Sequence, residues 1–153
     1  MTPDLHWTTI LSALLMPTVA VFGLFIARQQ LHIAKNKLKH ELFERRFSVY
    51  DAVRNLLASI VTSGKAKDEE ILKFLSGTRE AKWLLDEKIA KYLDDEFYSK
   101  ALDLQCLASE LEGLPIGDER STNVHKQREI KQWFSKQYDV LDEKFSPFLK
   151  LEH

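Results

Sequence analysis

The sequence predicts an all-α protein in which one N-terminal transmembrane helix is continuous with a cytoplasmic antiparallel helical bundle. Two observations lead to this prediction. Residues 7–27 contain no charged side chain, although 29% of the whole chain is charged. Beyond this run, apolar residues recur at helical spacing, and no useful length shows the two-residue alternation of a strand. The 153 residues suffice for one domain.

The uncharged run, WTTILSALLMPTVAVFGLFIA, would form a helix of roughly 31 Å, which matches the ~30 Å hydrocarbon core of a bilayer. A secretory signal peptide is the first alternative, but the six preceding residues contain Asp4 and no Lys or Arg. A buried soluble helix is the second, and it would need fewer uncharged residues. We therefore expect residues 7–27 to cross the membrane, with a bend at Pro17. Because the run has no ionisable residue, it does not favour a proton relay or a coupled transporter.

Basic residues follow the span directly and predict its orientation. Residues 28–40 contain four basic side chains and no acidic one. Such residues stay in the cytoplasm, so we expect the short N-terminus outside and the bundle inside the bacterial inner membrane. The same residues would lie beside anionic lipid headgroups, unless they serve orientation alone. They are Arg28, Lys35, Lys37 and Lys39.

Mostly small side chains repeat along one face of the span at alternating spacings of four and three. In a bilayer, small residues let helices approach closely and so favour association. We expect this face to form a homo-oligomer. Its residues are Thr9, Ala13, Met16, Ala20, Gly23 and Ala27.

Residues 28–149 are expected to form the bundle, and residues 151–153 resemble a tag remnant. The helix of the span should continue to about Thr62. Its apolar series is Leu31, Ala34, Leu38, Leu42, Val49, Val53, Leu56 and Ile60.

Turn and cap residues delimit the remaining helices. Asp68 should open a short helix that Gly77 and Thr78 end, and Thr78 should cap residues 79–85. Asp86 should cap a longer helix that runs to about Leu111. Its inward residues would be Ile89, Tyr92 or Leu93, Phe97, Leu104, Leu107 and Leu111. After the break at residues 113–117, the last helix should run from Asp118 and end before Pro147. Its inward residues would be Ile130, Phe134, Tyr138, Leu141 and Phe145.

The composition and motifs do not favour a nucleic-acid partner, a disulfide framework, a cofactor or a metal site. The net charge of −1 gives no reason to expect nucleic acid as a partner. The only cysteine, Cys106, excludes an internal disulfide framework, and its apolar neighbours predict a core position. We expect no cofactor, because no Walker loop or GxGxxG motif occurs, and no metal, because the histidines lack ligand spacing.

Two adjacent arginines, Arg45 and Arg46, fall on or beside the apolar face of the long helix, between Leu42 and Val49. A buried guanidinium needs a partner, so we expect at least one of them to pair with a carboxylate or a helix C-terminus.

One motif suggests catalysis. Arg120 and His125 form an R-x4-H spacing that resembles the signature of HEPN-type ribonucleases. The resemblance implies that both side chains line a cleft, usually at a dimer interface, and assist RNA cleavage by the neighbouring 2′-hydroxyl. Ser121 departs from the polar amide or acid that this family often has, and helix geometry turns His125 away from its own core. A capped, solvated helix start is the alternative.

A longer resemblance covers most of the chain. The stretch QLHIAKNKLKHELFERRFSVY, with TREA and LPIGDER further along, is similar to a widespread bacterial family with one N-terminal span and a cytoplasmic helical bundle. It implies topology and an all-helical fold, and supplies no activity. By architecture, the chain also resembles the HEPN-like membrane accessory protein of RNA-targeting CRISPR systems, which implies a pore-like ring and antiphage defence.

Together, these observations favour a non-enzymatic membrane protein that assembles into a pore or signalling scaffold. The alternatives are a membrane-tethered ribonuclease that uses Arg120 and His125, and a monomeric tether for a cytosolic protein partner.

Overall fold

The computed structural model describes residues 5–150, and the side chains of residues 19–150. The chain divides into two compact units, Met1–Glu41 and Leu42–His153. All regular structure between residues 5 and 150 is helical, which confirms the all-α class and the helical bundle.

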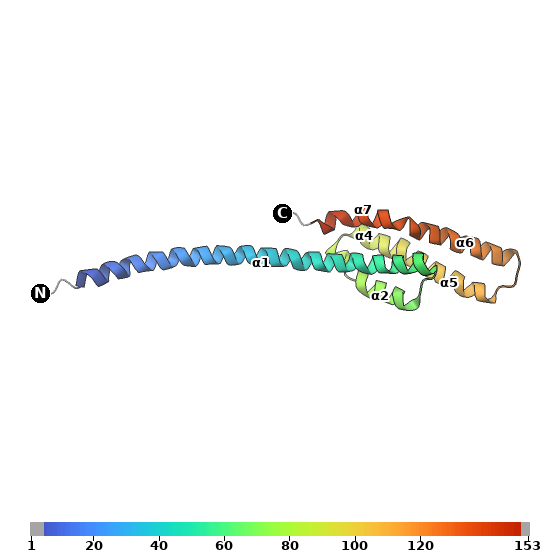
Figure 1. Ribbon diagram of the computed structural model, residues 1–153, viewed down its shortest axis with the longest axis horizontal. Helices are drawn as coiled ribbons and strands as arrows, with labels where there is room; N and C mark the ends of the chain where they lie inside the picture. The colour runs from blue at the N-terminus through green and yellow to red at the C-terminus, as the bar shows by residue number, and fades with distance from the viewer. Residues whose placement is uncertain (1–4, 151–153) are drawn as a thin grey trace. The chain divides into compact units, whose positions relative to one another are not determined.

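Eight helical segments follow one another in the described chain (Figure 1). They are α1 (Leu5–Ser63), α2 (Asp68–Thr78), α3 (Ala81–Leu84), α4 (Glu87–Lys91), the π-helix η1 (Tyr92–Tyr98), α5 (Ser99–Gly113), α6 (Asp118–Ser135) and α7 (Gln137–Leu149).

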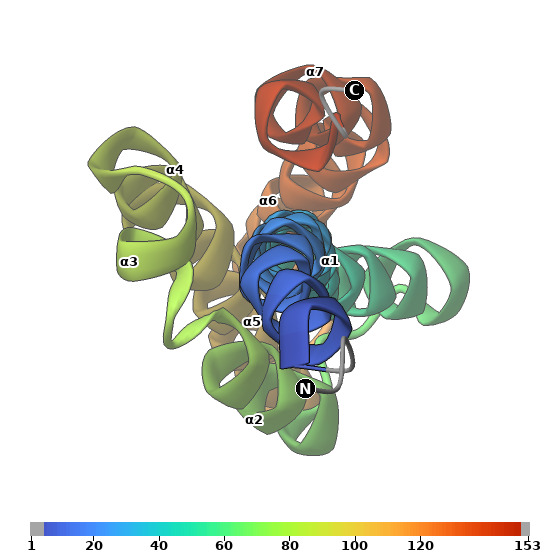
Figure 2. The same cartoon turned by 90° about the vertical axis from the view of Figure 1, so that its left-hand side faces the viewer.

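The second unit is an antiparallel bundle. The segments α4, η1 and α5 form one rod, and α6 and α7 return beside it after the connection at residues 114–117 (Figure 1). Viewed at 90° to this, the ribbons of α2, α4 and α7 lie on three different sides of the bundle (Figure 2).

The long helix α1 runs without interruption to Ser63, close to the predicted end at Thr62. The next residue is Gly64, whose φ of +69° is left-handed and therefore suits glycine, and whose N–H donates to the Ile60 carbonyl at 2.8 Å. The apolar series of α1 divides by burial. Val49, Val53, Leu56 and Ile60 are buried, whereas Leu31, Leu38 and Leu42 are exposed.

Among the residues whose side chains are described, no helix is both long and apolar enough to cross a membrane. Residues 7–18 of the predicted span, including Pro17, lie outside that part of the chain.

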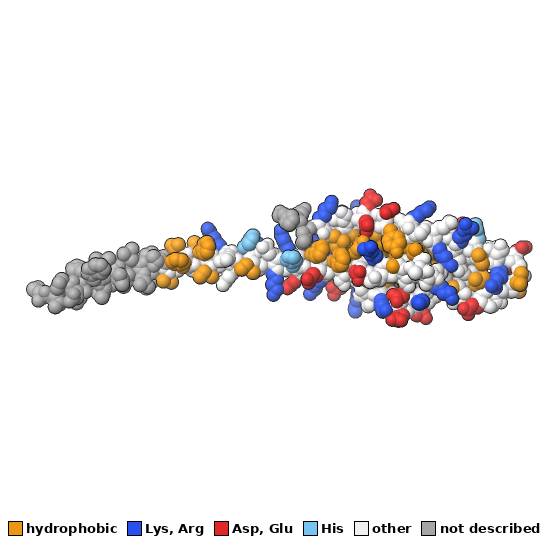
Figure 3. Space-filling view, in the orientation of Figure 1, with side chains coloured by type: hydrophobic (Ala, Val, Ile, Leu, Met, Phe, Trp, Pro, Cys, Tyr) orange, Lys and Arg blue, Asp and Glu red, His pale blue; other side chains and the backbone are white. Residues whose placement is uncertain are grey.

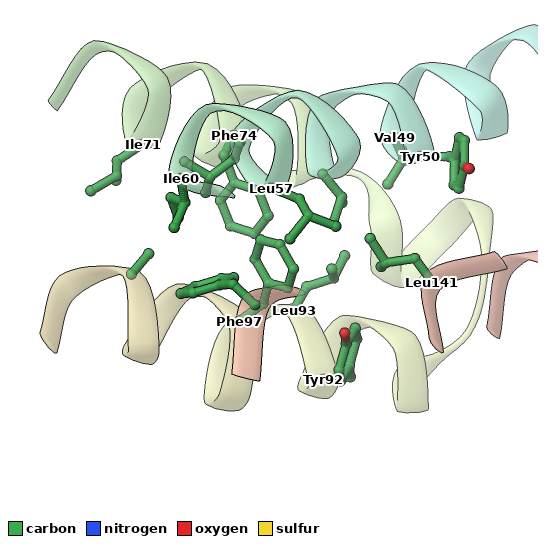
Figure 4. Packing of buried hydrophobic residues seen from close by; sticks show 14 of the residues in the cluster. Val49, Tyr50, Leu57, Ile60, Ile71, Phe74, Tyr92, Leu93, Phe97 and Leu141 are labelled. Atoms are coloured by element: carbon green, nitrogen blue, oxygen red, sulfur yellow. The ribbon is translucent and has the colours of Figure 1, made fainter. Parts of the chain in front are cut away.

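The core of the second unit is centred on Phe97, which is fully buried. Its ring stacks on Phe74 at 5.5 Å and makes edge contacts with Tyr92 at 6.3 Å, Trp133 at 6.0 Å and Phe134 at 5.2 Å. Figure 4 shows Phe74 and Phe97 pointing toward each other between their helices. This cluster joins α2, η1 and α6.

The predicted helix between Asp86 and Leu111 begins as expected but contains a π-helical segment. The Asp86 carboxylate accepts a hydrogen bond from the Ile89 N–H at 2.7 Å, so the predicted cap is confirmed. In η1, hydrogen bonds from residue i to i+5 place residues five apart on one face. Tyr92 and Phe97 therefore both face the core, and Leu93 is buried as well.

Three local predictions are wrong. Thr78 does not cap a helix; it is the last residue of α2, and its hydroxyl donates to the Phe74 carbonyl at 2.8 Å. Cys106 is exposed, because the neighbouring Leu104 takes the core position on α5. The last helix is interrupted at Lys136, and α7 continues past Pro147 to Leu149. In the last turn, proline removes only one helical hydrogen bond, so the helix tolerates it.

A glycine lies where α1 and α2 pack closely together. An added Cβ on Gly77 would lie 2.5 Å from the Cβ of Ala52, which is too short for a contact between non-bonded carbon atoms. Glycine therefore permits the close packing of α1 and α2 at this point.

Candidate functional site

The R-x4-H arginine holds the connection between α5 and α6. The Nη1 of Arg120 donates to the Leu111 carbonyl at 3.1 Å and to the Leu114 carbonyl at 2.9 Å. These carbonyls lie at the C-terminal end of α5, where helix carbonyls lack intrahelical partners and carry partial negative charge. Arg120 therefore acts as a C-terminal cap for the preceding helix.

Two buried amides extend this contact along the same face of α6. Asn123 and Gln127 each donate to the Leu107 carbonyl, at 3.0 and 3.1 Å, and Gln127 also donates to the Asn123 side-chain oxygen at 2.8 Å. This network was not expected from the sequence. The available signal was the spacing of residues 120, 123 and 127, which places three polar side chains on one helical face.

The His125 side chain points into solvent, away from the face of α6 that carries Arg120. Its side chain is 73% exposed, and its Nε2 lies 3.4 Å from an oxygen of Glu129 on the same helix. Five residues along a helix correspond to roughly 140° of rotation, so Arg120 and His125 lie on different faces of α6. The structure does not bring the candidate pair together.

A groove of about 360 Å³ opens beside α6. Its lining includes neither Arg120 nor His125, and consists of Leu107, Glu110, Leu114, Asp118, Glu119, Thr122, Asn123 and Lys126.

Arg120 and His125 should respond differently to substitution. We expect Arg120→Ala to lower the free energy of unfolding by about 1–3 kcal/mol, because it leaves helix-terminal carbonyls without their donor. We expect His125→Ala to change it by no more than about 0.5 kcal/mol, as for other exposed positions. Urea unfolding of the full chain in mild detergent, followed by near-UV circular dichroism, measures both. Equal stability of the two variants would contradict the capping role.

The ribonuclease hypothesis has its own discriminating measurement, which is cleavage of single-stranded RNA by the wild type and by His125→Ala. Equal cleavage by both proteins, or no cleavage by either, would exclude the hypothesis that the chain is a ribonuclease using His125.

The two adjacent arginines of α1 have different surroundings. The Nε of Arg46 donates to the Leu84 carbonyl at 2.9 Å, and its Nη1 to the Phe148 carbonyl at 3.4 Å. Its guanidinium also lies 5.9 Å from the centre of the Phe148 ring. Leu84 ends α3 and Phe148 lies in the last turn of α7, so Arg46 joins three helices through helix C-termini. Arg45 is exposed.

The neighbouring arginines give a matched pair of variants. We expect Arg46→Ala to destabilise the bundle by about 1–3 kcal/mol, because two partly buried carbonyls lose their donor and Phe148 loses a packing partner. Arg45→Ala should stay within about 0.5 kcal/mol of the wild type. Thermal unfolding of the full chain in mild detergent tests this expectation. If both variants melt like the wild type, Arg46 does not stabilise the bundle through its hydrogen bonds to the Leu84 and Phe148 carbonyls.

Two buried tyrosines also make polar contacts. The Tyr50 hydroxyl donates to Asp142 at 2.6 Å, and burial, together with this bond, raises the pKa of the phenol. The Tyr92 hydroxyl donates to Gln137 at 2.7 Å, and burial raises its pKa far above the ordinary value. Both phenols are therefore neutral at physiological pH, and they act as hydrogen-bond donors that link helices.

The predicted oligomer-forming residues fall partly outside the described side chains. Thr9, Ala13 and Met16 lie outside the part of the chain whose side chains are described. Ala20, Gly23 and Ala27 are described, and all three are exposed on α1. The four predicted headgroup-binding residues are exposed as well; they are Arg28, Lys35, Lys37 and Lys39.

The bundle surface carries mixed charge. Figure 3 shows Lys and Arg side chains interspersed with Asp and Glu over the visible face of the second unit. Within the described residues, no group of three or more His, Cys, Asp or Glu could hold a metal ion.

No family model, curated protein or solved structure matches this chain.

Proposed function

We propose that this protein is a single-pass inner-membrane protein whose copies assemble through α1, and that the helical bundle is the cytoplasmic part of this scaffold. One observation carries the proposal. The large apolar side chains of residues 19–26 are exposed, each by half or more of its surface. They are Val19, Val21, Phe22, Leu24, Phe25 and Ile26.

These residues follow one another closely along the helix, so they surround it on all sides. A helix that is apolar all round needs an apolar environment, which is either the core of a large protein or a bilayer. Within the first unit, residues 19–41 are all exposed, so this helix alone does not supply that environment. The charge-free sequence of residues 7–18, which precedes this segment, extends it to the length of a span.

The basic residues that follow support the orientation. Arg28 stands directly after the apolar segment, and three lysines come within the next eleven residues. This is the pattern expected on the cytoplasmic side of a span.

Two measurements test the proposal. The untagged full-length chain should remain in membranes after a carbonate wash and require detergent for extraction. Recovery in the aqueous fraction after ultracentrifugation would contradict the membrane location.

The second measurement is the particle mass in mild detergent, by light scattering after size exclusion. We expect a multiple of 17.8 kDa after the detergent contribution is subtracted. We expect Gly23→Leu to reduce this mass, because the larger side chain keeps helices apart, whereas Phe22→Leu should not. A strict monomer in the wild type would contradict assembly and favour a monomeric tether.

A further inference from the structure

The first unit carries a heptad pattern that extends beyond the predicted small-residue face. Leu24, Ala27, Leu31, Ala34 and Leu38 follow at spacings of three, four, three and four residues. This alternation keeps one row of side chains in line along a helix, and it is typical of helices that pack lengthwise against other helices. In each seven-residue repeat, leucine occupies the first position and alanine, where the row includes it, the fourth position.

This row has no cover within the first unit. Leu24 is 58% exposed, and Leu31 and Leu38 are each 59% exposed. Ala27 and Ala34 are exposed as well. Leu31, Ala34 and Leu38 lie beyond the span, where water would meet an unpaired leucine row, so burial of this row is favourable.

We propose that the same row of a second copy covers these residues, so that residues 24–38 form a parallel coiled-coil seam. This seam rests on the proposed function, because a shared membrane gives all copies one direction and one depth. Identical residues of two copies then lie at the same height, and Leu31 of one copy meets Leu31 of the other.

The charges beside the row favour this parallel arrangement. In a parallel pair, the flanking positions that face each other are Gly23 with Arg28 and Gln30 with Lys35. Neither pair opposes two like charges. An antiparallel pair would instead place Arg28 opposite Lys35 of the second copy, and the two cations would repel each other.

The seam also continues the predicted oligomer face. Ala27 belongs to both rows, and Ala20, seven residues earlier, occupies the same heptad position. A second copy can therefore form one continuous interface from the membrane into the cytoplasm. A cytosolic partner could cover only residues 31–38 of the row.

Cysteine cross-linking of the full chain tests the seam. In a Cys106→Ser background, which removes the exposed native thiol, single cysteines replace Ala34, Leu38 or Asn36. Asn36 is the matched control, because it is also exposed but lies on the opposite side of the helix from the row. Oxidation with copper phenanthroline in native membranes should cross-link Ala34→Cys and Leu38→Cys several-fold more than Asn36→Cys.

Equal or stronger cross-linking of Asn36→Cys would overturn the seam. The same samples distinguish this failure from failure of the proposed function. If the seam cysteines do not cross-link preferentially while the chain stays in washed membranes and keeps its oligomeric mass, only the seam is wrong. If the chain leaves the membranes, the proposed function fails, and preferential cross-linking of Ala34→Cys in solution would still support the seam.

Discussion

Replacing Phe97 by alanine is expected to lower the free energy of unfolding by about 3–5 kcal/mol, which is more than for Arg46→Ala or Arg120→Ala. Phe97 is fully buried and contacts aromatic rings from α2, from α6 and from its own helix. Its removal would leave a cavity among rings that the surrounding helices hold in place, and a cavity that cannot collapse adds to the lost transfer free energy.

Urea unfolding of the full chain in mild detergent, followed by near-UV circular dichroism, measures this loss. Trp83→Ala is the matched control, because it removes an aromatic ring that is 82% exposed, and its effect should stay within about 0.5 kcal/mol. Phe97→Leu, which fills more of the cavity, should fall between the two. If Phe97→Ala and Trp83→Ala unfold alike, the assignment of Phe97 as the core centre is wrong.

The burial of Phe97 was predictable because helical spacing survives over most of the chain. Phe134, Leu141 and Phe145 were also expected to face inward, and all three are buried. For these positions, local periodicity and the three-dimensional core agree, so the sequence pattern suffices.

The π-helical segment was not predictable in the same way. Helical spacing allows either Tyr92 or Leu93 on the inward face, and the structure buries both. The choice of i to i+5 hydrogen bonds depends on how Phe97 and Tyr92 pack against other helices, which is tertiary information. Cys106 shows the same limit, because apolar neighbours in sequence do not determine which side of α5 faces the core.

For the candidate site, the sequence identified Arg120 but not its partners. A spacing of five residues to His125 suggested a catalytic pair, whereas the side chain binds the carbonyls of Leu111 and Leu114. A motif of two residues states only their separation along the chain, and roughly 140° of helix rotation separates them in space. The residues that share the face of Arg120 are Asn123 and Gln127, two amides that are both buried.

The second large effect is expected at Gly77, where alanine should destabilise the bundle by about 1–3 kcal/mol. The new Cβ would lie 2.5 Å from the Cβ of Ala52, and both atoms are attached directly to helix backbone. No side-chain rotation can relieve this contact, so α1 and α2 must separate and disturb the packing of neighbouring residues. Urea unfolding of the full chain measures the loss.

The opposite exchange should restore much of this stability. Ala52→Gly alone should cost about 1 kcal/mol through helix propensity, but in Gly77→Ala it removes the clashing atom. The double variant should therefore be more stable than the sum of the single effects predicts. Gly113→Ala is the matched glycine control, because an added Cβ there meets no atom within 4 Å. Additive losses in the double variant, or equal losses in Gly77→Ala and Gly113→Ala, would show that direct contact between residues 52 and 77 does not limit the approach of α1 and α2.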